Sequence, residues 1–448
     1  MRRRDFIKKA GSIGAAAIAA PYILPSGRLF AATGSQMAKH VVYVLFAGGV
    51  RQQESVLQRY LADSQGLQWE GNIMYNMLSG APPQAKIAYG TDPQVGPSGA
   101  IPIPKILNQT LQEQGTLFPE VKAANGGHYG GLNTLITGNS SLTQGLRQKP
   151  VYPTVFEYAR RHLGAPASKV WFVGNTINNS VPLLNYSAHQ DYGVNYGANM
   201  LIPNVTFSSL GQDHLANAKI YHPEEELSHV QLMKQFLDNN WQINGGIAVD
   251  DIGNTQEEKQ QLKTFIDGVL DGSINIPQPP VSDNGDLRNI GYACAIMREF
   301  KPTITVVNMS SVDGCHSNFT GYLQSLHRAD HAVGHLWDFI QNDPDMAEMA
   351  NDTVIIATPE HGRNANPNSI LDENDWYGFD HADGNTNRIF SIMAGPGVPS
   401  NMVVGGESNP TGRATDNVLT IGEILGFKNE VMASGAVDPL ALSLFDRI

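Results

Sequence analysis

The chain has 448 residues, of which 41% are hydrophobic and 16% are charged, and it contains two cysteines. This composition is that of a globular protein, and two cysteines are too few for a disulfide scaffold or a four-cysteine zinc site. Acidic residues outnumber basic ones by 42 to 30. Because a negative surface repels a phosphate backbone, we expect no nucleic-acid partner.

The first 32 residues have the features of an export signal. Residues 3–8 read RRDFIK, which fits the twin-arginine pattern, and an alanine-rich run follows at 10–20. That run is too short to cross a bilayer but suits the apolar part of a signal peptide. The alternative is a basic helix start on a cytosolic protein. We predict that the twin-arginine export machinery carries the folded chain to the periplasm or outside the cell, and that the processed protein is not transmembrane.

After the leader, apolar runs alternate with helical patterns. Alternation of this kind predicts an α/β fold with a mostly parallel central sheet and helices on both faces. Functional loops are then expected at the carboxyl ends of the strands. The predicted strands are 41–46, 169–174, 303–308, 353–358 and 388–394, and the predicted helices are 154–163, 322–341 and 416–425.

The middle of the chain differs in character from the rest. Residues 186–281 are rich in Asn, Gln and Asp, with helical patches at 224–237 and 255–270 and a proline-stiffened connector at 274–280. We interpret this stretch as an insertion or cap on a single domain that spans 39–448.

The two cysteines lie in apolar surroundings. Cys294 is in a helical run and Cys315 follows a predicted strand. Both pairing after export and burial as separate thiols fit the sequence, and the apolar setting favours burial.

Three loops, each after a predicted strand or close to one, hold metal-ligating residue types. Asp313 and His316 follow one strand, Glu360 and His361 follow the next, and His381 lies twenty residues beyond His361. Carboxylate oxygens and imidazole nitrogens are the ligands that borderline divalent ions prefer. Convergence of these loops at one sheet edge predicts a divalent-metal centre.

Seven segments follow one another along the chain in a recognisable order. They are AGGVRQQE (47–54), GGHYGGLNTLITG (126–138), PTVFEYARRHLG (153–164), VDGCHSNFTGYLQSLHRADHAVG (312–334), ATPEHGR (357–363), FDHADG (379–384) and TDNVLTIGEILG (415–426). In this order the segments resemble the alkaline phosphatase superfamily of phosphatases, phosphodiesterases, sulfatases and phosphoglycerate mutases. The stretch at 358–363, followed by an Asp-His pair at 380–381, also resembles a twin-arginine-exported branch of uncharacterised function, in which the motif reads [ST]-E-F-G-R.

The resemblance implies a three-layer alkaline-phosphatase-like sandwich that hydrolyses a small anionic phosphate or sulfate ester. By the same resemblance, Asp313, His316 and His381 would form one metal site, and Glu360 and His361 would contribute to a second. One or two divalent ions are implied, with zinc expected and calcium or manganese as alternatives.

Two further residues are expected to contact the substrate. Arg363 could clamp an anionic oxygen of the ester in a forked geometry, and an ion pair with a local carboxylate is the equal alternative. His128 lies in the glycine-rich stretch of the second segment and is the other candidate for substrate binding.

The sequence also departs from the superfamily pattern. Gly48 stands where the first-strand Asp ligand belongs, with Glu54 as the nearest carboxylate, and Ala124 or Asn125 stands where Ser or Thr usually attacks. The C-x-P-S-R motif of formylglycine sulfatases is absent from the sequence. No nucleophile is therefore predicted, and the alternative function is a catalytically impaired relative that serves as an envelope binding or assembly protein.

A stripe of histidines marks the predicted helix 322–341. His327, His331 and His335 recur at intervals of four and so share a helix face, which could bind a transition metal. Because leucines and other apolar residues make up another face of this helix, we expect the histidines to face solvent instead.

Overall fold

The computed structural model describes residues 32–61, 68–82, 102–141, 149–175, 184–207, 252–281 and 285–448. The predicted export signal and the predicted helix at 224–237 lie outside the described residues. None of the helices in these ranges is long and apolar enough to cross a membrane.

An eight-stranded sheet runs through the middle of the molecule, in the order β10-β4-β9-β8-β1-β7-β5-β6. The strands β8, β1, β7, β5 and β6 are parallel, whereas β9 is antiparallel to both β8 and β4. A small β2-β3 ribbon lies apart from this sheet. The bounds are β1 His40–Phe46, β2 Arg59–Leu61, β3 Gln68–Glu70, β4 Gly115–Lys122, β5 Val170–Gly174, β6 Asn199–Leu201, β7 Ile304–Met309, β8 Thr353–Pro359, β9 Arg388–Ala394 and β10 Met402–Val403.

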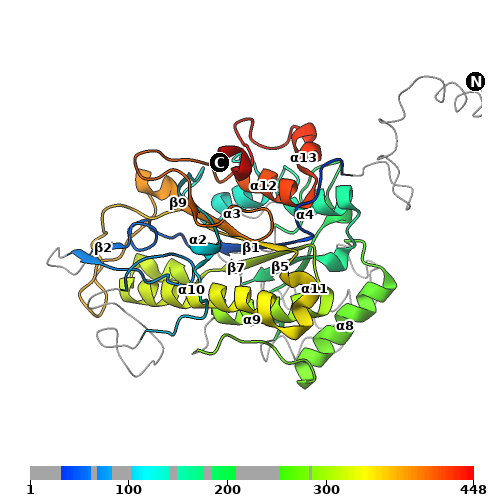
Figure 1. Cartoon of the computed structure of the whole chain (residues 1–448), viewed down its shortest axis with the longest axis horizontal. Coiled ribbons are helices and arrows are strands. Elements are labelled where there is room, and N and C mark those ends of the chain that lie inside the picture. The colour runs from blue at the N-terminus through cyan, green and yellow to red at the C-terminus, as the bar shows by residue number, and fades with distance from the viewer. Residues whose placement is uncertain are drawn as a thin grey trace, which may run out of the picture.

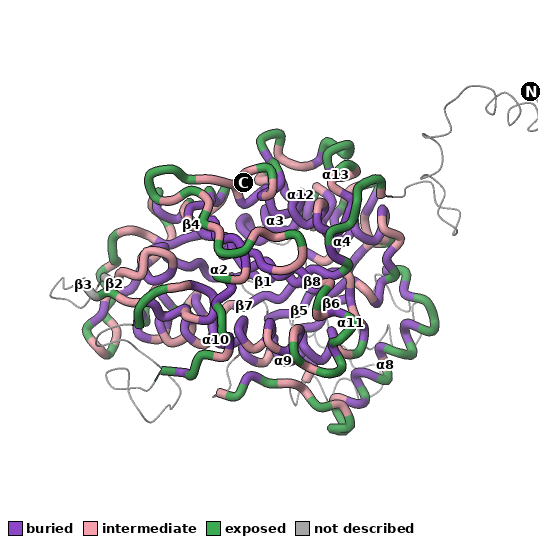
Figure 2. Tube along the Cα trace, viewed as in Figure 1, coloured by how far each residue is buried: buried purple, intermediate pink, exposed green. Residues whose placement is uncertain are grey.

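Helices cover both faces of the sheet, with α9 and α10 on one side and α3, α4 and α12 on the other (Figure 1). The sheet between them is buried (Figure 2). The helices are α2 Leu111–Gln114, α3 His128–Thr137, α4 Val155–Tyr158, α5 Pro203–Thr206, α8 Gln256–Asp271, α9 Gly285–Phe300, α10 Phe319–Asn342, α11 Ala347–Ala350, α12 Asp416–Leu425 and α13 Lys428–Ser434.

The alternation of side chains along β1 explains the two cores. Val42, Val44 and Phe46 pack with α9 and α10, whereas Tyr43 and Leu45 pack with the helices of the opposite face. A strand buried on both faces reads as a continuous apolar run, which is how this strand was predicted. The predicted α/β class, with a mostly parallel sheet between two helical layers, is confirmed.

The predicted elements agree with the structure to within a few residues. The helix predicted at 154–163 forms as α4 followed by a π-helical turn, Ala159–Leu163. Within the proposed insertion, α8 matches the patch at 255–270 and begins at a capping box made by Thr255 and Glu258. Among the elements that were not predicted are strand β4 and helix α3. Strand β4 contains Pro119 and two charged residues, and α3 begins in a glycine-rich stretch.

The cysteines are separate and buried, as expected: Cys294 lies on α9 and Cys315 follows β7. The expectation for the histidine stripe was wrong. His327 and His331 are buried, because segments around Ile73 and Ile103 lie over α10 and bond to the ring of His327.

Candidate metal centre

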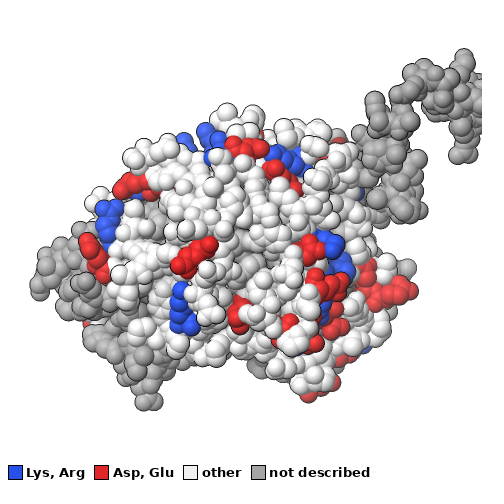
Figure 3. All heavy atoms as spheres, viewed as in Figure 1, with Lys and Arg blue, Asp and Glu red and all other residues white. Residues whose placement is uncertain are grey.

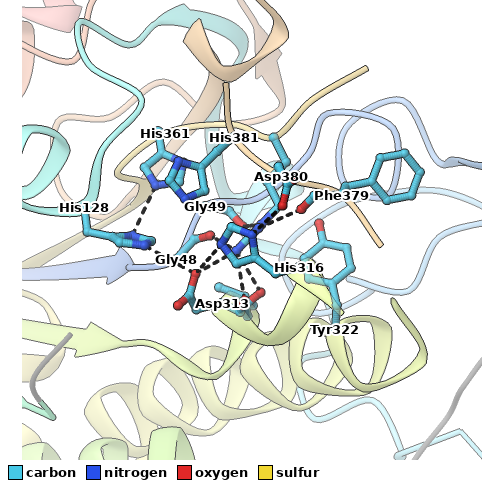
Figure 4. Close-up of polar contacts among 12 residues, drawn as sticks. Gly48, Gly49, His128, Asp313, His316, Tyr322, His361, Phe379, Asp380 and His381 are labelled. Atoms are coloured by element: carbon cyan, nitrogen blue, oxygen red, sulfur yellow. Dashed lines mark hydrogen bonds and ion pairs between the residues drawn. The ribbon is translucent and has the colours of Figure 1, made fainter. Parts of the chain in front are cut away.

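The neighbouring parallel strands β8, β1 and β7 end at the same edge of the sheet, and the candidate site lies beyond that edge. Figure 4 shows its imidazoles and carboxylates turned toward one another from segments far apart in the sequence. The contributions are Gly48 after β1, Asp313 and His316 in the 3-10 turn Ser311–His316 after β7, Glu360 and His361 after β8, His128 at the start of α3, and Asp380 and His381 from the loop before β9.

Three buried atoms that could each donate a lone pair to a metal ion form a close triangle, and we call such atoms donors below. Oε1 of Glu360 lies 2.7 Å from Nδ1 of His128 and 3.3 Å from Nε2 of His361, and the two nitrogens are 3.3 Å apart. In a tetrahedral zinc site with bonds of about 2.0–2.1 Å, ligand atoms are separated by about 3.3–3.4 Å. Two edges of the triangle therefore have the length that a bound zinc ion requires, and the third has the length of a hydrogen bond.

The surroundings hold these donors in orientation. The Gly48 N–H donates to Oε1 of Glu360 over 2.5 Å. Nδ1 of His361 donates to the carbonyl of Gly362 over 2.7 Å, which leaves the lone pair on Nε2 facing the triangle. Oε2 of Glu360 is buried and has no hydrogen-bond partner among the described residues. An unsatisfied buried carboxylate oxygen is costly, and a cation beside it would remove that cost.

A second group of donors lies on the more open side of the first. Nδ1 of His316 donates to Asp380 over 2.8 Å and Nδ1 of His381 donates to the Gly126 carbonyl over 2.6 Å. Both rings therefore keep a lone pair on Nε2. Together with His128 they place donor atoms within 4.8 Å of one another. His128 thus belongs to both groups, and it is nearer the centre of the site than its predicted substrate role implied.

The protonation of two of these groups suits a cation. Burial raises the pKa of Glu360, but the interactions with His128 and His361 outweigh it and set the pKa to about 2. Burial and the charges of neighbouring groups lower the pKa of His381 to about 4. The carboxylate is therefore ionised and the His381 imidazole neutral near pH 7, which are the states that bind metals.

His128 is the group for which a proton and a metal ion compete. Burial lowers its pKa, but the hydrogen bond to Glu360 and the charges of Glu360 and Asp313 outweigh burial, so the net shift is upward. The proton on Nδ1 points at Glu360. An ion in the triangle would take the place of that proton.

Asp313 and Arg363 form an ion pair beside the two donor groups. Oδ1 of Asp313 accepts from Nη2 of Arg363 over 2.9 Å and lies 3.5 Å from Nε2 of both His128 and His316. Among the described residues, Asp313 belongs to neither group of mutually close donors. Of the two roles that the sequence left open for Arg363, the structure contains the ion pair.

The backbone at Gly48 leaves no room for the missing ligand. Its φ of 102° lies in the region that favours glycine. A Cβ atom there would come within 2.6 Å of both Cβ and the backbone nitrogen of Asp313. Glu54 is buried in a bidentate pair with Arg51, so it does not replace the absent carboxylate.

The hydroxyl groups near α3 are bonded within the helix. Thr134 donates to the carbonyl of Gly130 over 2.8 Å, and Thr137 donates to that of Asn133 over 2.7 Å. The amide oxygen of Asn125 accepts from the Gly127 N–H. These contacts assign no attacking group to the segment in which the superfamily pattern places one.

No protein-family model matches the sequence, and no curated protein matches it. Solved structures to which the chain is similar include a variant of alkaline phosphatase PafA (10% identity, 92% of this chain and 99% of that chain covered, TM-score 0.43). Others are the lipoteichoic acid synthase LtaP from Listeria monocytogenes (11%, 92% and 74%, 0.40) and a protein in the alkaline phosphatase superfamily from Vibrio parahaemolyticus (10%, 91% and 71%, 0.39).

Proposed function

We propose that this protein is a metal-dependent hydrolase of a small phosphate or sulfate ester. The observation that carries the proposal is the triangle of Glu360 Oε1, His128 Nδ1 and His361 Nε2, with edges of 2.7–3.3 Å. The three atoms converge in a buried place, where a cation would replace the proton between His128 and Glu360. The cation would also partner Oε2 of Glu360, which has no hydrogen-bond partner among the described residues.

In this proposal His128, Glu360 and His361 hold the ion. Two imidazoles and one carboxylate favour zinc over calcium, with manganese as the next candidate. A divalent ion at this place supplies Lewis acidity toward an ester oxygen and lowers the pKa of a water molecule. The substrate would approach from the side of His316, whose side chain is 36% exposed, because Glu360 and His361 are fully buried.

His316 is suited to hold a proton on that open side. Asp380 accepts the hydrogen bond from Nδ1 of His316, which fixes the ring and directs the lone pair of Nε2 inward. A histidine held in this way by a carboxylate can take a proton from water or return one to a leaving group. This role needs no protein nucleophile.

The second candidate function is a catalytically impaired relative that acts as an envelope binding or assembly protein. Two observations favour it: Gly48 offers neither a ligand nor space for one, and the threonine hydroxyls of α3 are bonded to helix carbonyls. Such a protein would keep one metal ion for structure alone.

Metal analysis and an ester panel distinguish the two functions. The mature chain would be assayed with nitrophenyl phosphate, bis-nitrophenyl phosphate and nitrophenyl sulfate, with and without chelator, and its metal content measured. We expect chelator-sensitive turnover of at least one ester, and we expect Glu360→Gln to lose both the ion and the turnover. A tightly held ion with no turnover of any ester would favour the binding protein.

The proposed place of action is the periplasm or the cell exterior. The RRDFIK stretch at 3–8 and the apolar run after it support this location. Replacing Arg3 and Arg4 by lysine should retain the chain in the cytoplasm, because the twin-arginine route reads the arginine pair. Export of this variant at the normal level would contradict the proposed twin-arginine route.

A further inference from the structure

We infer that Arg363 serves as a fixed cation in place of a second metal ion, so that the centre takes a single divalent ion. The inference rests on the proposed function for the presence of any ion at all. It goes beyond that function by assigning the number of ions and the residue that limits it.

The guanidinium of Arg363 is enclosed by oxygen atoms. The side chain is fully buried. It donates to Oδ1 of Asp313 and to the Phe379 carbonyl over 2.9 Å each, to the Gly49 carbonyl over 3.2 Å, and to the Gly48 carbonyl. A shell of carboxylate and carbonyl oxygens is the environment in which proteins hold hard cations. Here a side chain of the protein itself occupies that environment.

The two groups of candidate ligands share one ring. His128 takes part in the group with Glu360 and His361 and also in the group with His316 and His381. A neutral imidazole carries a lone pair on only one of its nitrogens, because the other bears the proton. His128 can therefore complete one group at a time.

Residues that would complete a second site are already occupied or missing. Oδ1 of Asp313 accepts from Arg363. Position 48 is a glycine whose absent Cβ would collide with Asp313. Without these two carboxylates, a second ion would have to rely on His316 and His381.

The charges of the site balance with one ion. Glu360, Asp313 and Asp380 contribute three negative charges and Arg363 one positive charge, which leaves a net charge of −2 with neutral histidines. One divalent ion neutralises this set, whereas two would leave +2.

Counting zinc in the wild-type chain and in two variants tests the inference. Each protein is saturated with zinc, dialysed and analysed for metal per chain, and its circular dichroism spectrum and melting temperature confirm the fold. We expect about one ion in the wild type and about one in Arg363→Lys, which keeps the positive charge. Arg363→Gln should take up a second, weaker ion, because it frees Asp313 to join His316 and His381.

Two ions per wild-type chain would overturn the inference and leave the proposed function standing. A folded Arg363→Gln that still binds one ion would also overturn it. If Arg363→Gln does not fold, the wild-type count decides alone, with one ion in favour and two against. No bound zinc in the wild type would contradict the proposed function and the inference together.

Discussion

Nδ1 of His128 and Oε1 of Glu360 lie 2.7 Å apart, although 232 residues separate them in the sequence. The contact joins the start of α3 to the end of β8, and His361 closes it into a triangle of donors. A hydrogen bond between a buried carboxylate and an imidazole at this distance is also the contact that a metal ion would replace.

Loss of His361 should abolish zinc binding in the triangle. His361→Ala removes one of three donors, and we expect the dissociation constant for zinc to rise at least about 100-fold, a larger effect than loss of an outer partner. The measurement is a competition titration with a chromogenic chelator. His335→Ala is the matched control, since this partly buried histidine of α10 bonds to the Pro277 carbonyl, away from the centre. Equal affinities in the two variants would contradict the assignment.

His381 is expected to contribute less than His361. It belongs only to the second donor group, and its ring is held by the Gly126 carbonyl. His381→Ala should leave about one zinc ion per chain, measured by elemental analysis after dialysis, because the single ion is held in the triangle. Loss of that ion would make His381 one of its ligands.

A carboxylate introduced at position 48 should destabilise the fold without adding a ligand. Gly48→Asp combines an unfavourable φ of 102° with a contact of 2.6 Å to Asp313, and we expect a loss of roughly 2–4 kcal/mol in the free energy of unfolding. Gly272→Asp is the control. This glycine also has a positive φ, of 79°, but nothing lies within 4 Å of its Cβ position, so only about 1 kcal/mol should be lost. Urea denaturation compares them, and equal losses would show that the collision is unimportant.

The loop that carries Asp313 and His316 should depend on Asp286. This buried carboxylate accepts from the Ser310 N–H over 2.7 Å and from the Ser311 N–H over 3.0 Å. Asp286→Ala leaves both donors unsatisfied and should cost roughly 1–3 kcal/mol. Asp286→Asn retains an acceptor oxygen and should cost less. In urea denaturation, the midpoint of Asp286→Ala should therefore lie below that of Asp286→Asn. A higher midpoint for Asp286→Ala would contradict this prediction.

His327 should make the protein sensitive to acid. Burial lowers its pKa to about 4, and its Nε2 accepts from the Ile103 N–H while Nδ1 donates to the Ile73 carbonyl. The unfolded chain binds a proton at about pH 6.5 and the folded chain does not, so stability falls as the pH drops from about 6.5 to 4. The free energy of unfolding should decrease by on the order of 3 kcal/mol over this pH range.

Substitution of His327 separates its contribution to the acid sensitivity from the contributions of other titratable groups. His327→Gln keeps a donor and an acceptor but cannot be protonated in this range. Melting temperatures between pH 4 and 7 should therefore fall less steeply for this variant than for the wild type. Parallel curves would assign the acid sensitivity to other residues.

The strands of the sheet could be predicted because β1, β7 and β8 are buried on both faces and form unbroken apolar runs. The antiparallel direction of β9 could not, since pairing direction depends on a partner strand, β4, that proline and charge conceal in the sequence. The burial of His327 was missed for a related reason. Its partners near Ile73 and Ile103 are more than 200 residues away.

The candidate site was predictable in its residue types and not in its pairings. The strand ends identified Asp313, Glu360 and His361 as neighbours, because parallel strands end together. Helical periodicity does not show that His128 is the first residue of α3, so its place between the two donor groups became visible only in three dimensions. The pairing of Arg363 with Asp313 likewise depends on a turn whose path the sequence does not specify.

The donors of the triangle come from segments on either side of the insertion, at positions 128, 360 and 361. A partly folded or nascent chain cannot assemble them, so metallation has to be a late event that follows completion of the tertiary structure. If the arginine pair directs an already folded chain across the membrane, the site is complete before export and can take its ion in the cytoplasm. The metal pool of that compartment would then determine which element the exported protein carries.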